Sequence, residues 1–335
     1  MIHRTQEDIM KNWPKEWDSP LVSIRCIAYN HEPYISQTLD GILMQETDFP
    51  FEVIVHDDAS TDNTVNIIRA YEKKYPKIIK PIYETENQYS KHNGYVFKIV
   101  ASKCSGKYIA NCECDDYWTD SQKLKKQISF MEQNSDIIAT THNFSIVGKE
   151  NELLSVKYPS IKKGFYSLKD YRRGILPGQT ATLIFRNNFK NFSLLKEYQK
   201  YHWEPGAGDR RYYFLLASYG SIFCFPDNMS CYRYVTSSGS SFSANRKFSF
   251  QQNINYYKQL YDISKIYNAS KDSIYTAESL YLRSLWIAFL HKEVELVSFK
   301  ALLKIYNKIH FPIKSTLMVL YYYIHNILFK DKIKG

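Results

Sequence analysis

Short apolar segments alternate with amphipathic segments in the N-terminal part of the chain, and this alternation constrains the fold more than any other feature. The apolar segments are residues 21–28, 51–56, 78–83, 107–110 and 136–141. Between them, apolar residues recur at helical spacing, which is typical of amphipathic helices. Strands that alternate with helices form βαβ units, and such units build a largely parallel sheet. The sequence therefore predicts an α/β fold with a mostly parallel central sheet.

The second half of the chain has a less regular pattern. Residues 179–186 and 221–225 resemble strands, and residues 209–217 resemble a helix. A serine-rich stretch at residues 236–241 is typical of a boundary or a loop. From about residue 248 onward the pattern is helical and carries no strand signal. We therefore expect an α/β domain over residues 1–240, with its core from about residue 20, and a C-terminal helical region over residues 241–335.

Two acidic clusters follow predicted strands, at the point where each strand ends. Asp57 and Asp58 come after the second strand, and Glu113, Asp115 and Asp116 come after the fourth. Because the carboxyl ends of parallel strands meet at one edge of a sheet, both clusters are expected at the same ligand-binding edge. Carboxylates that crowd together repel one another unless a cation lies between them. Oxygen ligands of this kind favour Mg²⁺ or Mn²⁺, which typically also contact the phosphates of a substrate.

Cys112 and Cys114 lie on either side of Glu113 and suggest a different site, in which thiolates bind a metal. A structural zinc site needs four ligands, and no further Cys or His stands at ligand spacing. We therefore expect both cysteines to pack as small apolar side chains. The six cysteines are scattered through a chain whose first residues lead into no apolar leader segment, which indicates reduced thiols and a cytoplasmic protein.

The charge and the aromatic content leave the partner open. The formal net charge is +10, which fits either a solvated basic surface or an anionic partner. The 29 tyrosines suit core packing as well as carbohydrate stacking or a membrane interface.

Three motifs carry a family resemblance: IAYN at residues 27–30, HDDASTD at residues 56–62 and ECDDYW at residues 113–118. In this order and spacing they resemble the family 2 glycosyltransferases with the GT-A (Rossmann-like) fold, over about residues 20–235. The subgroup that the chain is most similar to makes bacterial capsular and other surface polysaccharides. The resemblance implies a metal-dependent, inverting transfer of a sugar from a nucleotide sugar, with a UDP-sugar as the expected donor. The acceptor would be a hydroxyl of a glycan or of a lipid-linked molecule.

The resemblance also implies residues that hold the nucleotide. The positions that match are Tyr29, Asn30, Glu32 and Asp58, the second Asp after the second strand, with Asp57 as its neighbour. An acidic side chain suits uracil, because the ring N–H is a hydrogen-bond donor. The alternative is that Asn30 and Asp58 only cap turns or helices.

The DxD-type motif of the family corresponds to residues 113–116. By the resemblance, Asp115 lies near the ribose or the metal, Asp116 is the metal ligand, and Glu113 stands where many relatives have Asp. The metal, Mn²⁺ or Mg²⁺, would neutralise the charge that develops on the departing nucleoside diphosphate.

Inversion requires a base that removes the proton of the acceptor hydroxyl. In the family this base is an Asp at the start of a helix, and the Gly208-Asp209 context matches it, so Asp209 is the expected base and Glu204 the alternative. A helix-capping role for Asp209 is the structural interpretation. The segment that contains Arg233 resembles a flexible segment that closes over the diphosphate, where Arg233 would contact phosphate or form a surface salt bridge.

The C-terminal residues 317–329 are apolar and rich in tyrosine, and they are flanked by Lys314, Lys330, Lys332 and Lys334. This pattern is typical of a helix that lies on an anionic membrane surface, here the inner face of the cell membrane. Packing of the same helix on the α/β domain is the alternative.

Two other classes of function fit less well. A sugar-phosphate nucleotidylyltransferase needs a glycine-rich basic loop after the first strand, and residues 29–33 (YNHEP) are not such a loop. A non-catalytic glycan- or nucleic-acid-binding module does not need acidic clusters, which repel phosphates unless a metal intervenes. We therefore expect no nucleic-acid partner.

Overall fold

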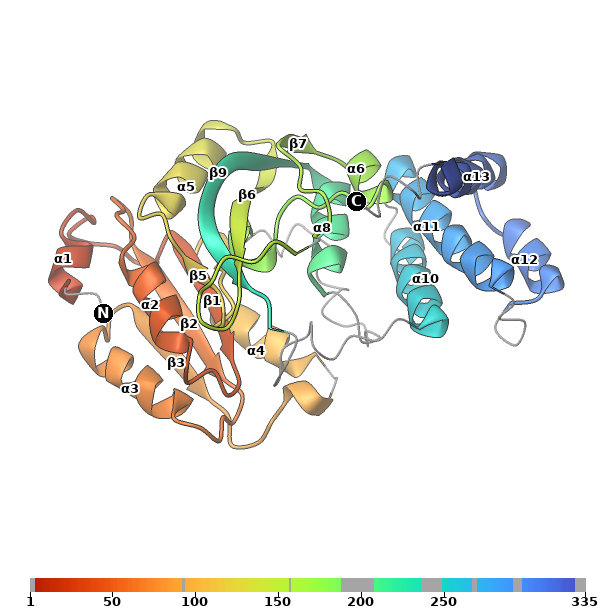
Figure 1. Cartoon of the computed structure of the whole chain (residues 1–335). Coiled ribbons are helices and arrows are strands. Elements are labelled where there is room, and N and C mark those ends of the chain that lie inside the picture. Colours follow the sequence, from red (N-terminus) through yellow and green to blue (C-terminus); the bar gives the residue numbers. More distant parts are fainter. Residues whose placement is uncertain are drawn as a thin grey trace. The chain divides into compact units, whose positions relative to one another are not determined.

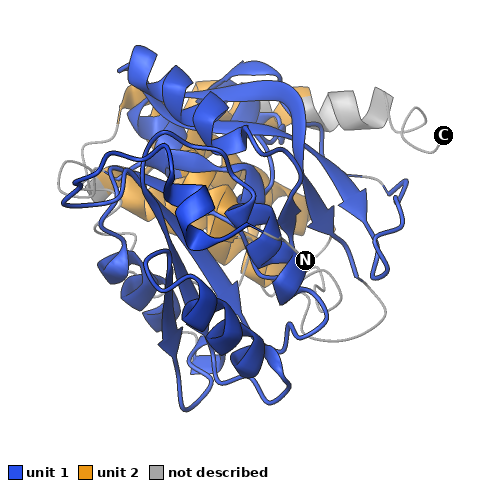
Figure 2. Cartoon of the chain, turned by 90° about the vertical axis from the view of Figure 1, so that its left-hand side faces the viewer, with its two compact units in different colours: residues 1–202, 215–246 blue, residues 203–214, 247–335 orange. Residues whose placement is uncertain are grey.

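The computed structural model describes residues 4–91, 94–156, 158–187, 208–235, 249–266, 270–291 and 297–328. The chain divides into two compact units (Figure 2). The first unit comprises residues 1–202 and 215–246, and the second comprises residues 203–214 and 247–335.

The first unit is built around one mixed sheet with the strand order β3-β2-β1-β4-β8-β6-β9-β5, and β7 pairs with β9. Its N-terminal strands are β1 (Val22–Ala28), β2 (Phe51–Asp57), β3 (Ile79–Tyr83) and β4 (Tyr108–Asn111). All pairings among these four strands are parallel. The predicted α/β fold with a mostly parallel central sheet is therefore confirmed.

Helices connect these strands as the sequence pattern predicts. The first unit contains α1 (Gln6–Met10), α2 (Ile35–Leu43), α3 (Thr64–Lys74), the 3₁₀ helix η1 (Tyr89–Lys91), α4 (Tyr95–Lys103), α5 (Lys123–Gln133) and α6 (Leu168–Arg172). Figure 1 shows α2 and α3 side by side in front of β1, β2 and β3. The four apolar residues that predicted α2 are completely buried: Ile35, Leu39, Ile42 and Leu43.

Beyond β4 the sheet becomes mixed. The remaining strands are β5 (Tyr117–Trp118), β6 (Ile137–Val147), β7 (Gly164–Tyr166), β8 (Ile184–Arg186) and β9 (Ser221–Arg233). β6 and β9 are parallel, whereas β8 is antiparallel to β4 and β6, and β5 is antiparallel to β9. In Figure 1 the long, curved β9 lies along β6. Both strands are longer than the sequence predicted, because each continues through polar residues beyond its apolar segment.

The strand predicted over residues 179–186 is only partly correct. Residues Thr180–Thr182 form a 3₁₀ helix (η2), and the strand β8 begins at Ile184. The reason is local, because Oε1 of Gln179 accepts a hydrogen bond from the amide of Ala181 (2.8 Å) and so caps a helical turn.

Helix α2 approaches β5 very closely. A Cβ atom at Gly41 would lie 2.7 Å from the carbonyl oxygen of Trp118, so only glycine fits there. This contact places α2, which follows the first strand, directly against the strand that follows the acidic residues 113–116.

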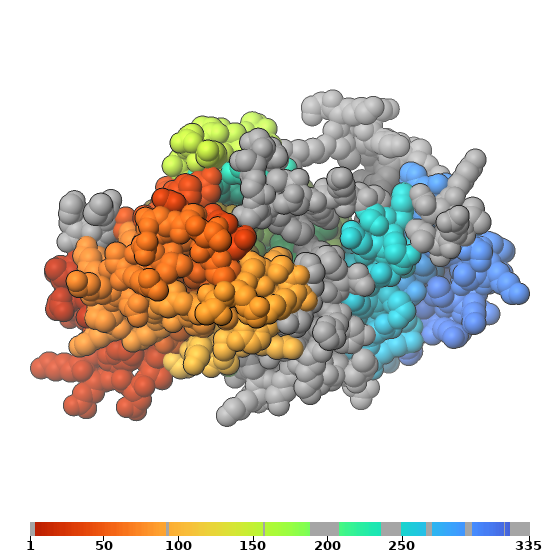
Figure 3. Space-filling view, turned by 90° about the horizontal axis from the view of Figure 1, so that it is seen from below, coloured from red at the N-terminus to blue at the C-terminus, as the bar shows by residue number. Residues whose placement is uncertain are grey.

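The second unit is helical. Its helices are α10 (Phe250–Ile266), α11 (Lys271–Leu290), α12 (Phe299–Tyr306) and α13 (Pro312–Leu328), while α8 (Gly208–Tyr219) contributes residues to both units. α11 packs against α10, α12 and α13, and Figure 3 shows the cyan and blue atoms of these helices next to one another. Of the helices in the described parts of the chain, none is both long and apolar enough to cross a bilayer.

Candidate active site

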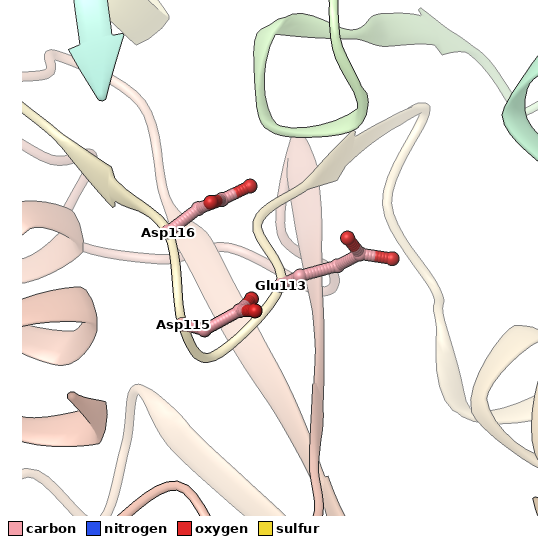
Figure 4. Close-up of side chains that lie close together, drawn as sticks. All are labelled: Glu113, Asp115 and Asp116. Atoms are coloured by element: carbon pink, nitrogen blue, oxygen red, sulfur yellow. The ribbon is translucent and has the colours of Figure 1, made fainter. Parts of the chain in front are cut away.

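The acidic residues after β4 form a tight cluster. One carboxylate oxygen of each of Glu113, Asp115 and Asp116 lies within 4.8 Å of the other two (Figure 4). The turn that carries them stays attached to β1, since the amide of Cys114 donates to the carbonyl of Ile27 (3.3 Å). Three oxygen ligands at this spacing suit Mg²⁺ or Mn²⁺. We call the segment that carries them, residues 113–116, the metal turn.

The three carboxylates differ in exposure. Glu113 is exposed, Asp115 is partly exposed and Asp116 is completely buried. Burial, and after it the neighbouring carboxylates of Asp115 and Glu113, raise the pKa of the Asp116 carboxyl well above its ordinary value. A cation within the cluster would reverse this repulsion, so the residues fit a divalent metal.

Asp116 is held by two residues that are distant in sequence. Its Oδ1 accepts a hydrogen bond from the main-chain amide of Arg233 (2.8 Å), and its Oδ2 accepts one from Nε2 of Gln179 (2.5 Å). Neither contact has a local sequence pattern, because both depend on long-range pairing of the mixed part of the sheet. Each oxygen keeps a second lone pair that is available to a metal.

Arg233 also contacts the metal turn, through a hydrogen bond from its side chain to the carbonyl of Asp115. Its side chain is buried, and its five N–H groups donate to oxygens of five residues: Asp115, Gly148, Lys149, Gln37 and Asn151. These acceptors are main-chain carbonyls or side-chain amides. Its guanidinium carbon also lies 4.4 Å from the centre of the Tyr34 ring.

The expectations for Arg233 are therefore corrected. The residue belongs to β9 and not to a flexible segment, and it does not form a surface salt bridge. All five donors of the guanidinium are used within the protein, so none is left for phosphate. Arg233 positions the metal turn.

The loops after β1 and β2 are joined by hydrogen bonds. Asn30 adopts a positive φ of 55°, and its Oδ1 accepts from the amide of Thr61 (2.8 Å). Oε2 of Glu32 accepts from the amide of Asn63 (3.1 Å), while Tyr29 is partly exposed in the same turn. These contacts agree with the capping interpretation of Asn30, and contact with a nucleotide stays a prediction.

Asp57 and Asp58 are both buried but have different partners. The Asp58 oxygens accept from the amides of Gln88 (2.8 Å) and Tyr89 (2.9 Å), so this carboxylate orders the loop after β3. Oδ2 of Asp57 accepts from the amide of Ser60 (3.0 Å). Oδ1 of Asp57 has no donor among the described residues, although a buried acceptor is costly to leave unpaired.

His31 is a site residue that the sequence did not indicate. Burial alone would lower the pKa of its imidazole, but a hydrogen bond with Cys114 and the nearby Asp115 carboxylate raise the pKa overall. Its Nδ1 has no partner among the described residues. The imidazole of His31 therefore lies beside the metal turn, with one ring nitrogen that has no partner among the described residues.

The cysteines of the turn do not belong to the metal cluster. All six cysteines are free, and Cys112 and Cys114 are completely buried in the core of the first unit. Their predicted packing role is confirmed.

Lys123, the first residue of α5, lies beside Trp118. It is completely buried, and its Nζ lies 4.0 Å from the centre of the Trp118 ring, without a hydrogen-bond partner among the described residues. Burial lowers the pKa of the Lys123 ammonium to about 7.

The predicted base lies on α8. Asp209 is the second residue of this helix, and its Oδ1 accepts from the amide of Arg210 (2.8 Å). Glu204, the alternative base, lies outside the described residues.

A mixed α/β sheet with a carboxylate cluster at the end of β4 and a capped loop after β1 defines an α/β ligand-binding domain of the GT-A class. The sequence profile described as Glycosyl transferase family 2 matches residues 23–197, more than half of the chain, and the chain belongs to this family. The predicted family and fold are thereby confirmed.

Three relatives each match about two fifths of this chain. Rv1520 of Mycobacterium tuberculosis is 43% identical over 126 residues, which is 38% of this chain and 36% of that protein. The putative teichuronic acid biosynthesis glycosyltransferase TuaG of Bacillus subtilis is 32% identical over 141 residues, 42% of this chain and 51% of TuaG. An Escherichia coli enzyme, UDP-Glc:alpha-D-GlcNAc-diphosphoundecaprenol beta-1,3-glucosyltransferase WfgD, is 34% identical over 139 residues, 39% of this chain and 51% of WfgD. The chain thus spans between a third and half of the length of these relatives.

A solved structure resembles most of the fold. TarS of S. aureus, residues 1–349 in complex with UDP-GlcNAc, aligns with a TM-score of 0.57 at 19% identity, over 85% of this chain and 78% of that one. At this identity the similarity concerns the fold.

Proposed function

We propose that this chain is a metal-dependent, inverting glycosyltransferase that moves a sugar from a UDP-sugar to a hydroxyl of a glycan or a lipid-linked acceptor in surface polysaccharide synthesis. The observation that carries this proposal is the cluster of three carboxylates within 4.8 Å at the end of β4, in a chain of the glycosyltransferase 2 family. The names of TuaG and WfgD, and the UDP-GlcNAc bound to TarS, support the substrate class.

In this proposal the metal turn holds Mn²⁺ or Mg²⁺. Asp115 and Asp116 are the proposed ligands, and Glu113 is the most accessible of the three carboxylates. When bound, the metal supplies positive charge that offsets the negative charge of the departing diphosphate. The buried Arg233 and Gln179 keep Asp116 in place before the metal arrives.

The nucleoside would occupy the joined loops after β1 and β2. Tyr29, Asn30 and Glu32 supply one side, and Asp57 and Asp58 the other. The unpaired Oδ1 of Asp57 is the acceptor that we assign to the N–H of uracil, because Asp58 already accepts two amides.

Asp209 is the proposed base. It would remove the proton from the acceptor hydroxyl as that oxygen attacks the anomeric carbon. The first turn of a helix favours the ionised carboxylate that this task requires.

The proposal also covers the organisation and location of the protein. The α/β domain over residues 1–240 would carry the reaction, and the helical region over residues 241–335 would contact the inner face of the cell membrane, which suits a lipid-linked acceptor.

A donor-binding experiment tests the enzyme class. The protein is titrated calorimetrically with UDP-, GDP- and dTDP-sugars, with and without Mn²⁺. We expect Mn²⁺-dependent binding of a UDP-sugar, and Asp115→Asn should weaken it at least tenfold. The matched control is Asp136→Asn, which changes an exposed carboxylate outside the site. Absence of metal-dependent binding across the panel would refute the proposal, while binding of a GDP-sugar alone would refute the choice of UDP.

A further inference from the structure

Among the described side chains of helix α13, four large apolar ones are exposed. Its inward side carries Ser315, which is completely buried and lies 3.3 Å from the hydroxyl of Ser279 on α11. The four apolar residues lie three or four positions apart, from 313 to 317 and on to the adjacent pair 320 and 321, with the following exposed fractions: Ile313 71%, Leu317 61%, Leu320 49% and Tyr321 53%. Such exposure is unusual, because the apolar side of a surface helix usually faces the protein.

Hydrogen bonds attach the start of α13 to α11. Glu278 on α11 is completely buried, and its two oxygens accept from the amides of His310 (2.6 Å) and Phe311 (3.1 Å). A carboxylate at a helix N-terminus is stabilising, and here it ties the two residues before α13 to α11.

Helix α12 also exposes large apolar side chains. Phe299 is 56% exposed and Leu303 is 50% exposed, one helical turn apart, while the neighbouring Leu302 is buried. Lys300 and Lys304 follow these two residues directly and form a parallel basic stripe. Adjacent apolar and basic stripes are typical of helices that lie in a membrane interface.

The positive charge of residues 297–328 favours an anionic partner. Residues 297–328 contain four lysines, at positions 300, 304, 308 and 314, and no Asp or Glu. A second copy of the chain would bring lysines opposite lysines across a symmetric contact. An anionic lipid surface complements both properties, since its headgroups attract the lysines and its acyl boundary accepts the apolar side chains.

We propose that α12 and α13 dock on an anionic lipid bilayer through the exposed apolar residues of both helices and the lysines beside them. This lipid-docking surface consists of Phe299, Leu303, Ile313, Leu317, Leu320 and Tyr321. It deepens the proposed function, because docking brings the chain to the layer in which a lipid-linked acceptor resides, but the binding itself does not depend on catalysis.

Vesicle sedimentation with the full chain tests the surface. The vesicles contain phosphatidylcholine alone or phosphatidylcholine with 30% phosphatidylglycerol, and binding is measured at 0.1 M and 0.5 M NaCl. At these salt concentrations charges are screened beyond about 10 Å or less, so the salt series separates the electrostatic part of binding from apolar insertion. We expect binding to the anionic vesicles, weakened by salt. The double variant Leu303→Asp/Leu317→Asp should bind at least about tenfold more weakly, because each Leu side chain contributes about 2 kcal/mol when buried.

The matched control is Leu153→Asp, which changes a leucine that is 78% exposed on the first unit and should leave vesicle binding unchanged. Circular dichroism and binding of the UDP-sugar by the double variant should match the wild type, which separates failure of docking from failure of folding or of the proposed function. Three results overturn the inference: no binding to anionic vesicles, equal binding to both vesicle types, or a dimer in light scattering that the double variant dissolves while lipid binding is absent.

Discussion

The main-chain amide of Arg233 donates a 2.8 Å hydrogen bond to Oδ1 of Asp116, across 117 positions of the sequence. The conformation of the metal turn therefore depends on two distant segments: the end of β9 and Gln179, the residue before η2. Substitutions in these segments are expected to change metal binding.

Replacing Gln179 by Leu removes the donor to Oδ2 of Asp116. A buried carboxylate oxygen that loses its partner costs about 1–3 kcal/mol of unfolding free energy. Loss of an outer-shell contact also lowers metal affinity, by about 10- to 100-fold. Urea denaturation and Mn²⁺ titration measure the two effects. Gln122→Leu, which removes only the exposed 2.7 Å bond to Glu46, is the control, and equal effects of both variants would contradict the role of Gln179.

Arg233→Lys should destabilise the protein although it keeps the charge. An ammonium has three donors where the guanidinium has five, and it cannot reproduce the planar contact with Tyr34. The unpaired buried carbonyls should cost about 2 kcal/mol or more. The midpoint of urea unfolding checks this, and an unchanged midpoint would show that the network around Arg233 contributes little.

Asp57→Asn and Asp58→Asn should separate nucleotide binding from stability. Asp58→Asn weakens charge-assisted bonds to the amides of Gln88 and Tyr89, so we expect a loss of about 1–3 kcal/mol of unfolding free energy. Asp57→Asn should instead weaken UDP binding by about tenfold or more. The variant places an NH₂ group where Oδ1 was, and this donor cannot accept a hydrogen bond from the uracil N–H. Calorimetric titration with UDP decides, and wild-type affinity in Asp57→Asn would refute the assignment.

Asp209→Asn should abolish sugar transfer and leave binding of the UDP-sugar nearly intact. Loss of a general base typically costs a factor of about 10² to 10⁴ in rate. Transfer is followed by release of UDP in the presence of acceptor, with Asp136→Asn as the control. If binding of the donor is lost together with transfer, the assigned role of Asp209 is incorrect.

Lys123→Met should change how stability depends on pH. Burial places the pKa of Lys123 at about 7 in the folded protein, against an ordinary value of 10.5. Between these values the unfolded chain binds a proton that the folded chain lacks, so the free energy of unfolding of the wild type rises with pH. Relative to Lys123→Met, the rise should approach about 1.4 kcal/mol per pH unit from pH 8 to 9. Parallel curves for both proteins would show that Lys123 stays charged.

The parts that the sequence predicted well are those with local causes. The buried stripe of α2 and the apolar strands β1 and β2 follow from side-chain periodicity alone. The acidic residues of the metal turn were recognisable because they follow such a strand.

The parts that the sequence missed depend on contacts between distant segments. β9 extends to Arg233 because β5 and β6 pair with it, and Gln179 starts a 3₁₀ turn in an apparent strand because its side chain is used by Ala181 and Asp116. Neither residue carries a local pattern, so their roles emerge only from the folded chain.

The close approach of Gly41 to Trp118 limits what position 41 can accept. Main-chain atoms of α2 and β5 meet there without an intervening side chain, so the spacing of these two elements is set by their backbones. Any larger residue at position 41 would push α2 away from β5 and would shift the loop after β1 relative to residues 113–116.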